Sequence, residues 1–480
     1  MRYLAFVLFL IVALAGFYGF SKPMPSGLDT RSELYPINTE QVRFLADRTF
    51  RHANSNDEPV YEHTIFDTML KNIADASDLV VLDMFLYNDH QGKVGEIRRL
   101  LSQELTDALI TKKENHEHIE IYAISDPING MYGTLWPDHF ARLENAGIPV
   151  TITDLQMLPD SNPIYSALYR AGLQYLPEIG GGWLPNVFDS KAQGMHLNAY
   201  AQLLNFKANH RKVLVTGGAT GWRGIVTSMN AHDASSSHSN VALEIRDHPI
   251  INDIIQSEQA ILNFSAEQPP ILPSIEFDTP TASELSIQLI TERAIKESIL
   301  GRIDSLGDGD MIDLAAFYIS DRNVVRALKA ADSRGVRIRA LFDPNQDAFG
   351  REKNGIPNRQ VASELMKYTD GNTTVRWCVT HGEQCHNKFM ITHTSDETEL
   401  ILGSANFTKR NLENRNLETN IRLVGPPTSP TLTDAQNFFD EQWGNQEGRL
   451  YSTEYETFAD TSRLRTIWYH LGEFTGMSHY

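Results

Sequence analysis

Apolar residues along this chain follow two spacings, and the same succession of spacings occurs twice. A three-to-four-residue spacing, typical of an amphipathic helix, comes first, a β-rich run follows, and after another helix comes a strand that ends in Asp-Pro. The order appears at residues 64–76, 78–87 and 118–127, and again at 290–303, 310–319 and 335–344. Strands that alternate with helices predict α/β layers with a mixed sheet in each half.

Two connectors divide the chain, whose 480 residues are too many for one ordinary domain. The stretch 265–284 carries four prolines, which is typical of a linker. We therefore expect one domain at 37–264 and a second at 285–480. The separation from Asp126 to His210 in the first domain exceeds that from Asp343 to His386 in the second by about 41 residues, so we expect an insert at about 155–200. The insert either covers a functional site or is an ordinary segment that packs on the domain without a functional role.

The N-terminus is the most apolar part of the chain. After Arg2, 18 residues from Tyr3 to Phe20 carry no charge, and Lys22 follows. This length is close to the minimum for a membrane span and also suits a secretory signal. We expect residues 1–24 to form an uncleaved single-pass anchor that leaves the catalytic part outside the cytoplasm. The alternative is a cleaved signal, which would make the protein secreted.

Composition limits the choice of partner. The net charge of −19 lowers the expectation of a nucleic-acid binder, which usually has a basic surface. The chain has two cysteines, Cys378 and Cys385, which are enough for one disulfide but too few for a structural zinc site unless His381 or another residue joins them. Whether the disulfide forms stays open, and no metal or cofactor is predicted.

One motif occurs once in each half. His-x-Lys is followed eighteen residues later by Ser-x-Asn, and all four positions in one half lie 176 residues from those in the other. The two sets are His210, Lys212, Ser228 and Asn230, and His386, Lys388, Ser404 and Asn406. Residues i and i+2 of a strand point to one face, so each His-Lys pair can address one ligand. The repetition makes the motif far more specific than a single copy.

These side chains suit phosphodiester chemistry. Ammonium and carboxamide groups bind the non-bridging oxygens of a phosphate and stabilise the charge that develops there. One imidazole can attack phosphorus while the other protonates the leaving oxygen. Water or an alcohol then displaces the phosphohistidine, and no metal is required.

The paired motif resembles the phospholipase D superfamily, and within it the cardiolipin synthase and phosphatidyltransferase-like members. The resemblance spans about residues 40–450. It implies two αβα sandwich domains with mixed sheets, related by a pseudo-twofold, with the active site at their interface. It also implies that the two histidines, lysines and asparagines are catalytic, with Ser228 and Ser404 supporting them. Two further acids, Glu418 and its first-half counterpart Glu244, are expected to orient the histidines. His210 is expected to be the nucleophile and His386 the acid.

Three positions depart from the family pattern. The Asp of the motif is Gly217 in the first half and His393 in the second, and Thr227 stands where the family usually has Gly. These changes leave the His, Lys and Asn in place but put the orienting residues of the site in doubt.

The resemblance and the apolar N-terminus together predict a phospholipase D-type phosphodiesterase or phosphatidyltransferase that acts on membrane phospholipids. A nuclease or phosphodiesterase acting on nucleic acid is the alternative, and a catalytically impaired member is a third. Because both half-sites lie in one chain, no obligate oligomer is expected. The sequence does not determine the lipid head group or the acceptor.

Overall fold

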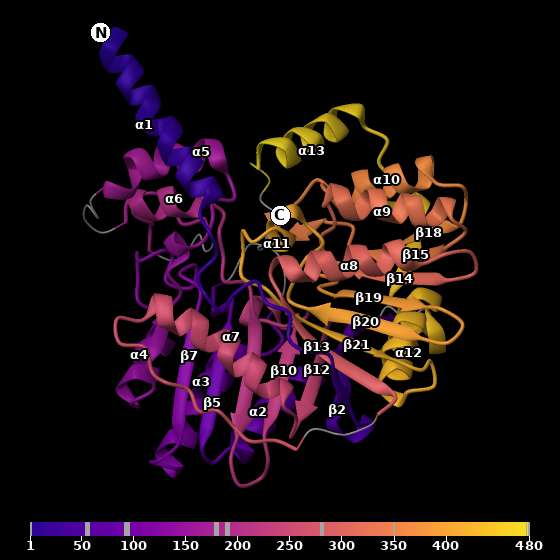
Figure 1. Cartoon of the computed structure of the whole chain (residues 1–480), viewed down its shortest axis with the longest axis horizontal. Helices are drawn as coiled ribbons and strands as arrows, with labels where there is room; N and C mark the ends of the chain where they lie inside the picture. Colours follow the sequence, from indigo (N-terminus) through magenta and orange to yellow (C-terminus); the bar gives the residue numbers. More distant parts are fainter. Residues whose placement is uncertain are drawn as a thin grey trace.

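The computed structural model of the protein describes residues 2–52, 58–90, 97–176, 182–187, 193–278, 283–348, 351–476 and 478. Its strands form two large mixed sheets, which Figure 1 shows in the lower left and the right of the molecule. The first sheet has the order β2 (Val42–Asp47), β12 (Asn240–Arg246), β10 (Arg223–Thr227), β9 (Lys212–Gly217), β5 (Leu79–Met84), β7 (Glu120–Ser125) and β8 (Val150–Ile152). The second has β1 (Tyr35–Ile37), β13 (Leu285–Thr291), β21 (Thr419–Gly425), β20 (Thr398–Gly403), β19 (Lys388–His393), β14 (Met311–Ala316), β15 (Arg337–Phe342), β18 (Thr373–Cys378) and β23 (Ser452–Glu454).

The two sheets repeat one topology. In each, the strand that follows the His-x-Lys histidine lies between the strand that carries Ser-x-Asn and the first strand of the repeat, so β9 and β19 occupy equivalent places. Both pair antiparallel with their neighbours, while β5 with β7 and β14 with β15 pair parallel. This confirms the expected two-domain α/β fold with mixed sheets, because each predicted strand lies within its predicted range.

The sheets share a core between them and have helices on their outer faces. Val81 of β5 and Phe389 of β19 face the shared core, which also contains α7 (Ile250–Ser265) and α12 (Pro430–Gly444). Alternate residues point outward, Leu82 toward α2 (Thr64–Asp75), α3 (Leu101–Asn115) and α4 (Asp138–Asn145), and Met390 toward α8 (Arg293–Ser305), α9 (Arg322–Ser333) and α10 (Asn358–Tyr368). Because both faces are buried, these strands are apolar at nearly every position.

Several contacts join the halves. Strand β1 lies before the first sheet in sequence but pairs with β13 of the second sheet. A buried ion pair joins Arg211, next to His210, to Glu292 at the start of α8, at 2.6 Å, and Glu258 of α7 lies 3.2 Å from the same guanidinium. The main-chain nitrogen of Glu418 also donates to Glu292, at 3.1 Å. The exact domain limits expected from sequence stay a prediction, but the second sheet takes one strand, Tyr35–Ile37, from the boundary of the expected first domain.

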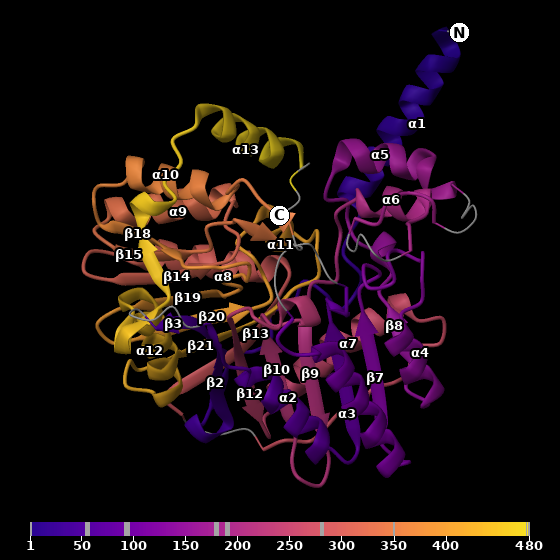
Figure 2. The ribbon, with the colours of Figure 1, turned by 180° about the vertical axis from the view of Figure 1, so that it is seen from behind.

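The N-terminal residues form one helix, α1 (Arg2–Ser21), which projects from one end of the molecule (Figures 1 and 2). Its last turn contacts the body of the protein, where the nitrogen of Asp160 donates to the oxygen of Gly19 and Arg415 lies over the ring of Phe20. None of the helices in the described part of the chain has the length and apolarity needed to cross a membrane. The expected single-pass anchor is therefore not supported.

The extra residues of the first half form a small lobe beside α1. It contains α5 (Pro163–Ala171) and α6 (Leu197–Leu203), and α5 packs against α1. Parts of the expected insert, at 177–181 and 188–192, lie outside the described residues.

Candidate functional site

The two motif histidines lie where the halves meet. His210 and His386 each directly precede a motif strand by two residues, and both are buried. The nitrogen of His210 donates to the oxygen of Leu417 in the second half, at 2.9 Å, and the nitrogen of His386 donates to the oxygen of Ser239 in the first half, at 3.0 Å. Each histidine is therefore held by backbone of the opposite half.

The ring partners of the histidines also come from the opposite half, and they differ. Nδ1 of His210 lies 2.9 Å from the carboxylate of Glu418, whereas Nδ1 of His386 lies 3.1 Å from Oδ1 of Asn240. Both partners are acceptors, so they favour the tautomer with the proton on Nδ1 and leave the Nε2 lone pair of the neutral ring available. No residue in the described ranges hydrogen-bonds either Nε2. His210 thus has an anionic partner and His386 a neutral one.

The lysines are arranged alike in the two halves. Lys212 Nζ lies 4.7 Å from the ring centre of Phe85 and donates to the oxygen of His210, at 2.5 Å. Lys388 Nζ lies 5.1 Å from the ring of Phe317 and donates to the oxygen of His386, at 3.0 Å. The same phenylalanine rings lie 4.6 Å from His210 and 5.0 Å from His386. An aromatic face thus orients each lysine and borders each imidazole.

The serines and the asparagines of the two Ser-x-Asn motifs have different surroundings. Ser404 Oγ donates to Glu418 at 2.5 Å, and Ser228 Oγ bonds Asn240 Oδ1 at 3.2 Å, so each serine holds the partner of a histidine. The amide oxygens of Asn230 and Asn406 are buried and have no hydrogen-bond partner among the described residues. Buried amide oxygens without protein partners are typical of a ligand-binding site.

Burial and mutual repulsion make this site unfavourable for positive charge. Burial lowers the pKa of His210 to about 4, against the opposing effect of Glu418, and lowers the pKa of Lys212 to about 7. For Lys388 and His386, burial and then the neighbouring cations hold each pKa well below its usual value. Because Lys212 and His210 both contribute to the lowered pKa of His386, the two half-sites are close enough to interact. A bound anion would reverse these shifts, so the site is suited to an anionic ligand.

Glu244 is not at this site, contrary to the sequence expectation. Its carboxylate accepts from Asn72 at 2.9 Å, from Arg43 at 3.1 Å and from Arg246 at 2.7 Å. The place equivalent to Glu418 is taken by Asn240, which bonds Ser228 as Glu418 bonds Ser404. Side chains alternate along a strand, and Glu244 lies four residues beyond Asn240 on β12, near its far end.

The positions of the missing motif aspartates lie far from the histidines. Gly217 and His393 are the last residues of β9 and β19, and five residues of strand separate them from the lysines, about 17 Å. A Cβ on Gly217 would lie 2.0 Å from the ring of Trp222, so the indole occupies the room of a side chain. His393 hydrogen-bonds Thr398 and Gln436 instead. The two departures therefore affect the far ends of the strands and not the motif histidines and lysines.

Cysteines 378 and 385 form a disulfide with a Cα–Cα distance of 6.2 Å. It joins the end of β18 to the residue before His386, and the nitrogen of Cys385 donates to Asp343 at 2.8 Å. The described residues contain no group of three or more His, Cys, Asp or Glu side chains arranged to hold a metal ion.

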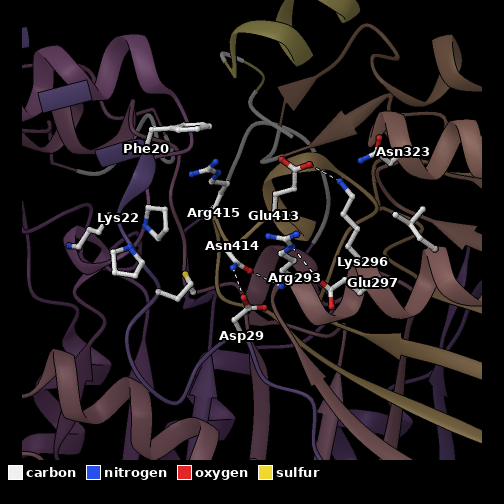
Figure 3. Close-up of a pocket in the computed structure, with 14 residues that line it drawn as sticks. Phe20, Lys22, Asp29, Arg293, Lys296, Glu297, Asn323, Glu413, Asn414 and Arg415 are labelled. Atoms are coloured by element: carbon white, nitrogen blue, oxygen red, sulfur yellow. Dashed lines mark hydrogen bonds and ion pairs between the residues drawn. The ribbon is translucent and has the colours of Figure 1, made fainter. Parts of the chain in front are cut away.

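A cavity of about 660 Å³ is lined in part by Glu413, Asn414 and Arg415 of the segment that precedes Glu418 (Figure 3). It lies between the end of α1 and α8, and Phe20, Arg415, Glu413 and Lys296 are among the residues that line it. Lys296 pairs with Glu413 at 2.6 Å. The motif histidines do not line this cavity.

Four residues of the site were missed by sequence reasoning. Phe85 and Phe317 each directly follow the first strand of the repeat, and this equal placement was a signal in the sequence. Asn240 and Asn411 had no such signal, because Asn240 replaces an acid and Asn411 reaches Glu418 from a short helix, α11 (Lys409–Leu412), nearby.

Comparisons with known proteins agree with this geometry. A family model described as cardiolipin synthase, PLD-like domain, matches residues 303–443. No curated protein matches the chain. Among solved structures, phosphatidylserine synthase from Haemophilus influenzae Rd KW20 is similar with a TM-score of 0.58 and 9% identity, covering 97% of this chain and 98% of that one.

Other solved structures are similar at lower TM-scores. Polyphosphate kinase from Porphyromonas gingivalis has a TM-score of 0.47 and 14% identity, covering 91% of this chain and 53% of that one. The phospholipase D family member Nuc from Salmonella typhimurium has a TM-score of 0.27 and 21% identity, covering 34% of this chain and 95% of that one. The family match in the second half and the two-domain fold of the whole chain confirm the resemblance to the phospholipase D superfamily.

Proposed function

We propose that this protein is a phosphodiesterase or phosphatidyltransferase that acts on phospholipids through a phosphohistidine. The observation that carries the proposal is the pair of histidines held across the interface, each with Nδ1 occupied and Nε2 unbonded by the described residues. Two lysines accompany them, as do Asn230 and Asn406, whose amide oxygens have no partner among the described residues and whose amide NH2 groups are donors. This set supplies a nucleophile, an acid and groups that bind the non-bridging oxygens.

The unequal partners assign the roles. Glu418 stabilises the positive charge that develops on His210 as its Nε2 attacks phosphorus, so His210 is the nucleophile. The anionic phosphate raises the pKa of His386 again when it binds, so that His386, whose partner is a neutral amide, takes up a proton at Nε2. It gives this proton to the leaving oxygen and later takes one from the attacking water or alcohol. Lys212, Lys388, Asn230 and Asn406 bind the phosphate oxygens in both steps.

Phospholipid is the proposed substrate class, and the match to a cardiolipin synthase domain and the fold of phosphatidylserine synthase support it. The net charge of −19 argues against nucleic acid as the alternative substrate. A catalytically impaired protein is disfavoured because the missing aspartates lie about 17 Å from the lysines.

The test is a panel of phospholipids and oligonucleotides with mass detection of modified histidine. We expect turnover of phospholipid in the presence of EDTA and a phosphatidyl adduct on His210, since only the head-group alcohol leaves when Nε2 bonds to phosphorus. His210→Ala should abolish both adduct and turnover, whereas His386→Ala should slow product formation by about a hundredfold or more. Loss of all turnover with EDTA, or an unchanged rate in His386→Ala, would overturn the mechanism. Cleavage of oligonucleotides alone would overturn the substrate class.

A further inference from the structure

Helix α13 (Arg463–Thr475) has its apolar side facing away from the protein. Leu464, Ile467, Trp468, Leu471 and Phe474 are all exposed, Leu464 by 71% and Phe474 by 87%. At 3.6 residues per turn these five side chains lie within an arc of about 120°. A surface helix ordinarily turns such an arc toward the core, so α13 has the reverse orientation.

The opposite side of α13 holds it firmly to the second half. Tyr469 is buried and its hydroxyl donates to the oxygen of Ser320 at 3.0 Å, while Arg322 lies 5.9 Å from its ring. Glu473, one turn later, is also buried. The side chain of Ser462 caps the start of the helix, and Gly476 ends it in the left-handed conformation. The outward apolar face is therefore a fixed feature and not the result of a loose helix.

A second exposed apolar group lies in the lobe of α5 and α6. Its large side chains are Ile164, Leu168, Tyr175, Trp183, Leu197 and Leu204. Helix α1, whose apolar side chains are also largely exposed, projects from this lobe. In both Figure 1 and Figure 2, α1, α5, α6 and α13 occupy the same end of the molecule. We call this end, with these four helices, the apolar end.

Both apolar groups connect to the candidate active site. Helix α6 ends seven residues before His210. At the end of α13, the oxygen of Ser478 accepts from Arg410, the neighbour of Asn411, and Asn411 binds the Glu418 that holds His210. The apolar end is thus directly attached to the segments that carry the nucleophile and its partner.

Charge at this end favours an anionic apolar surface. Arg463 and Arg465 are exposed along the edges of the apolar arc of α13. Arg465 pairs with Asp460, but Arg463 has no ion-pair partner among the described residues. Cationic side chains beside Trp, Leu and Phe are typical of helices that lie in the plane of a lipid interface. A water-soluble protein partner would not require the adjoining apolar α1.

We propose that the apolar end docks on an anionic phospholipid bilayer, with α13 lying in the interface beside the site. The surface differs from a membrane span, because α13 lies flat and contributes one face only. It also goes beyond the proposed reaction, since the docking is a binding property that an inactive enzyme would keep.

The test uses the full chain and vesicles of phosphatidylcholine with a minority of phosphatidylglycerol. Replacing Ile467 and Trp468 by serine together should weaken flotation with the vesicles by at least about tenfold, because two large apolar side chains no longer leave water. The matched control replaces Ile271 and Leu100, which are exposed but lie outside the apolar end, by serine, and should float as the parent does. Hydrolysis of a soluble phosphodiester should stay the same in all three proteins, so a failure of docking is distinguishable from a failure of the proposed function.

A second measurement locates the helix directly. Lipids brominated along the acyl chain should quench part of the fluorescence of the parent, and that part should disappear in Trp468→Phe, which keeps the apolar face. Equal flotation of the serine variant and the parent, or no quenching that depends on Trp468, would overturn the proposal. Self-association that the serine substitutions abolish, without vesicle binding, would show instead that a second copy covers the face.

Discussion

Glu418 makes the two halves of the site unequal at the level of single residues. It comes from the second half but holds Nδ1 of His210 in the first, while Ser404 and Asn411 hold its carboxylate. His386 has only the amide of Asn240 in the equivalent place. A charge that grows on His210 is therefore stabilised more than one that grows on His386, which separates the roles of two residues with the same motif.

Glu418→Gln should reduce kcat by about a hundredfold or more, because an amide neither stabilises an imidazolium nor fixes the tautomer as a carboxylate does. The measurement is single-turnover formation of the phosphohistidine. Glu244→Gln is the matched control, and its kcat should stay within about twofold of the parent, since Glu244 binds Asn72, Arg43 and Arg246 instead. A large loss in Glu244→Gln with none in Glu418→Gln would contradict the geometry.

The pH profile should be displaced to the acidic side. In the proposed mechanism His210 attacks as the neutral ring, and because its pKa is lowered to about 4, protonation of His210 should inhibit only near that pH. Lys212 must be charged to hold the phosphate, and because its pKa is lowered to about 7, kcat/KM should fall as the pH rises above neutrality. The measurement is kcat/KM on a soluble phosphodiester, and a maximum well above pH 7 would contradict it. In Lys212→Arg the guanidinium stays charged, so the alkaline decline should move upward.

The motif residues themselves were predictable because the same four residue types recur at a constant offset of 176 residues. Substitutions at other positions do not change this offset. Their partners were not. Sequence spacing cannot tell that the carboxylate of Glu418 contacts a histidine of the opposite half. In the place equivalent to Glu418, the first half has the amide Asn240 instead of an acid, so residue type did not identify it. The spacing from the motif serine is two residues longer to Glu244 than to Glu418, and this difference was a sign in the sequence that the two acids are not equivalent.

At the scale of elements, the strands β9 and β19 carry chemistry at one end only. Their first residues are the lysines, and their last residues, Gly217 and His393, are packed by neighbouring side chains. The indole of Trp222 occupies the space beside Gly217, so the loss of the aspartate is compensated by packing.

Gly217→Asp should not raise activity and should lower stability. The new Cβ would meet Trp222 at 2.0 Å, so the indole must move. His393→Asp is the matched variant, since His393 has polar partners and is only partly buried, and it should cost less. The measurement is the denaturant midpoint of each, with kcat alongside. A gain in kcat from either substitution would show that the far ends of these strands do influence the site.

The strands of the repeat were predictable because apolar residues on both faces produce continuous runs that Asp-Pro or Gly-Gly ends. The N-terminal helix was also predictable, but its role was not, since the docking of its last turn on Asp160 and Arg415 depends on residues distant in sequence. The strand β1 has only three residues, which is too short for a recognisable alternation of apolar and polar positions.

At the scale of the whole molecule, the site exists only while the two halves stay together. Arg211, fully buried, pairs with Glu292 of the second half, and Glu292 also accepts from the nitrogen of Glu418. The pair thus couples the segment of His210 to the segment of Glu418.

Glu292→Gln should lower the free energy of unfolding by about 3 kcal/mol, because it removes one partner of a buried cation. Glu297→Gln, which loses only exposed pairs with Arg31 and Arg293, should change it by less than about 0.5 kcal/mol. Chemical denaturation measures both, and equal stability of the two variants would contradict the coupling. A lower kcat of Glu292→Gln at denaturant concentrations below its unfolding transition would show that the Arg211–Glu292 pair also positions the site.

The pairing of β1 with β13 has a consequence for how the chain is made. The partner strand of Tyr35–Ile37, Leu285–Thr291, leaves the ribosome about 250 residues later, which at 5–20 residues per second is a delay of about 12 to 50 seconds. During that interval the first strand has no edge to join. The earlier strand therefore stays unpaired until the second half is made, and a separately expressed second half would expose the edge of β13 as a surface for aggregation.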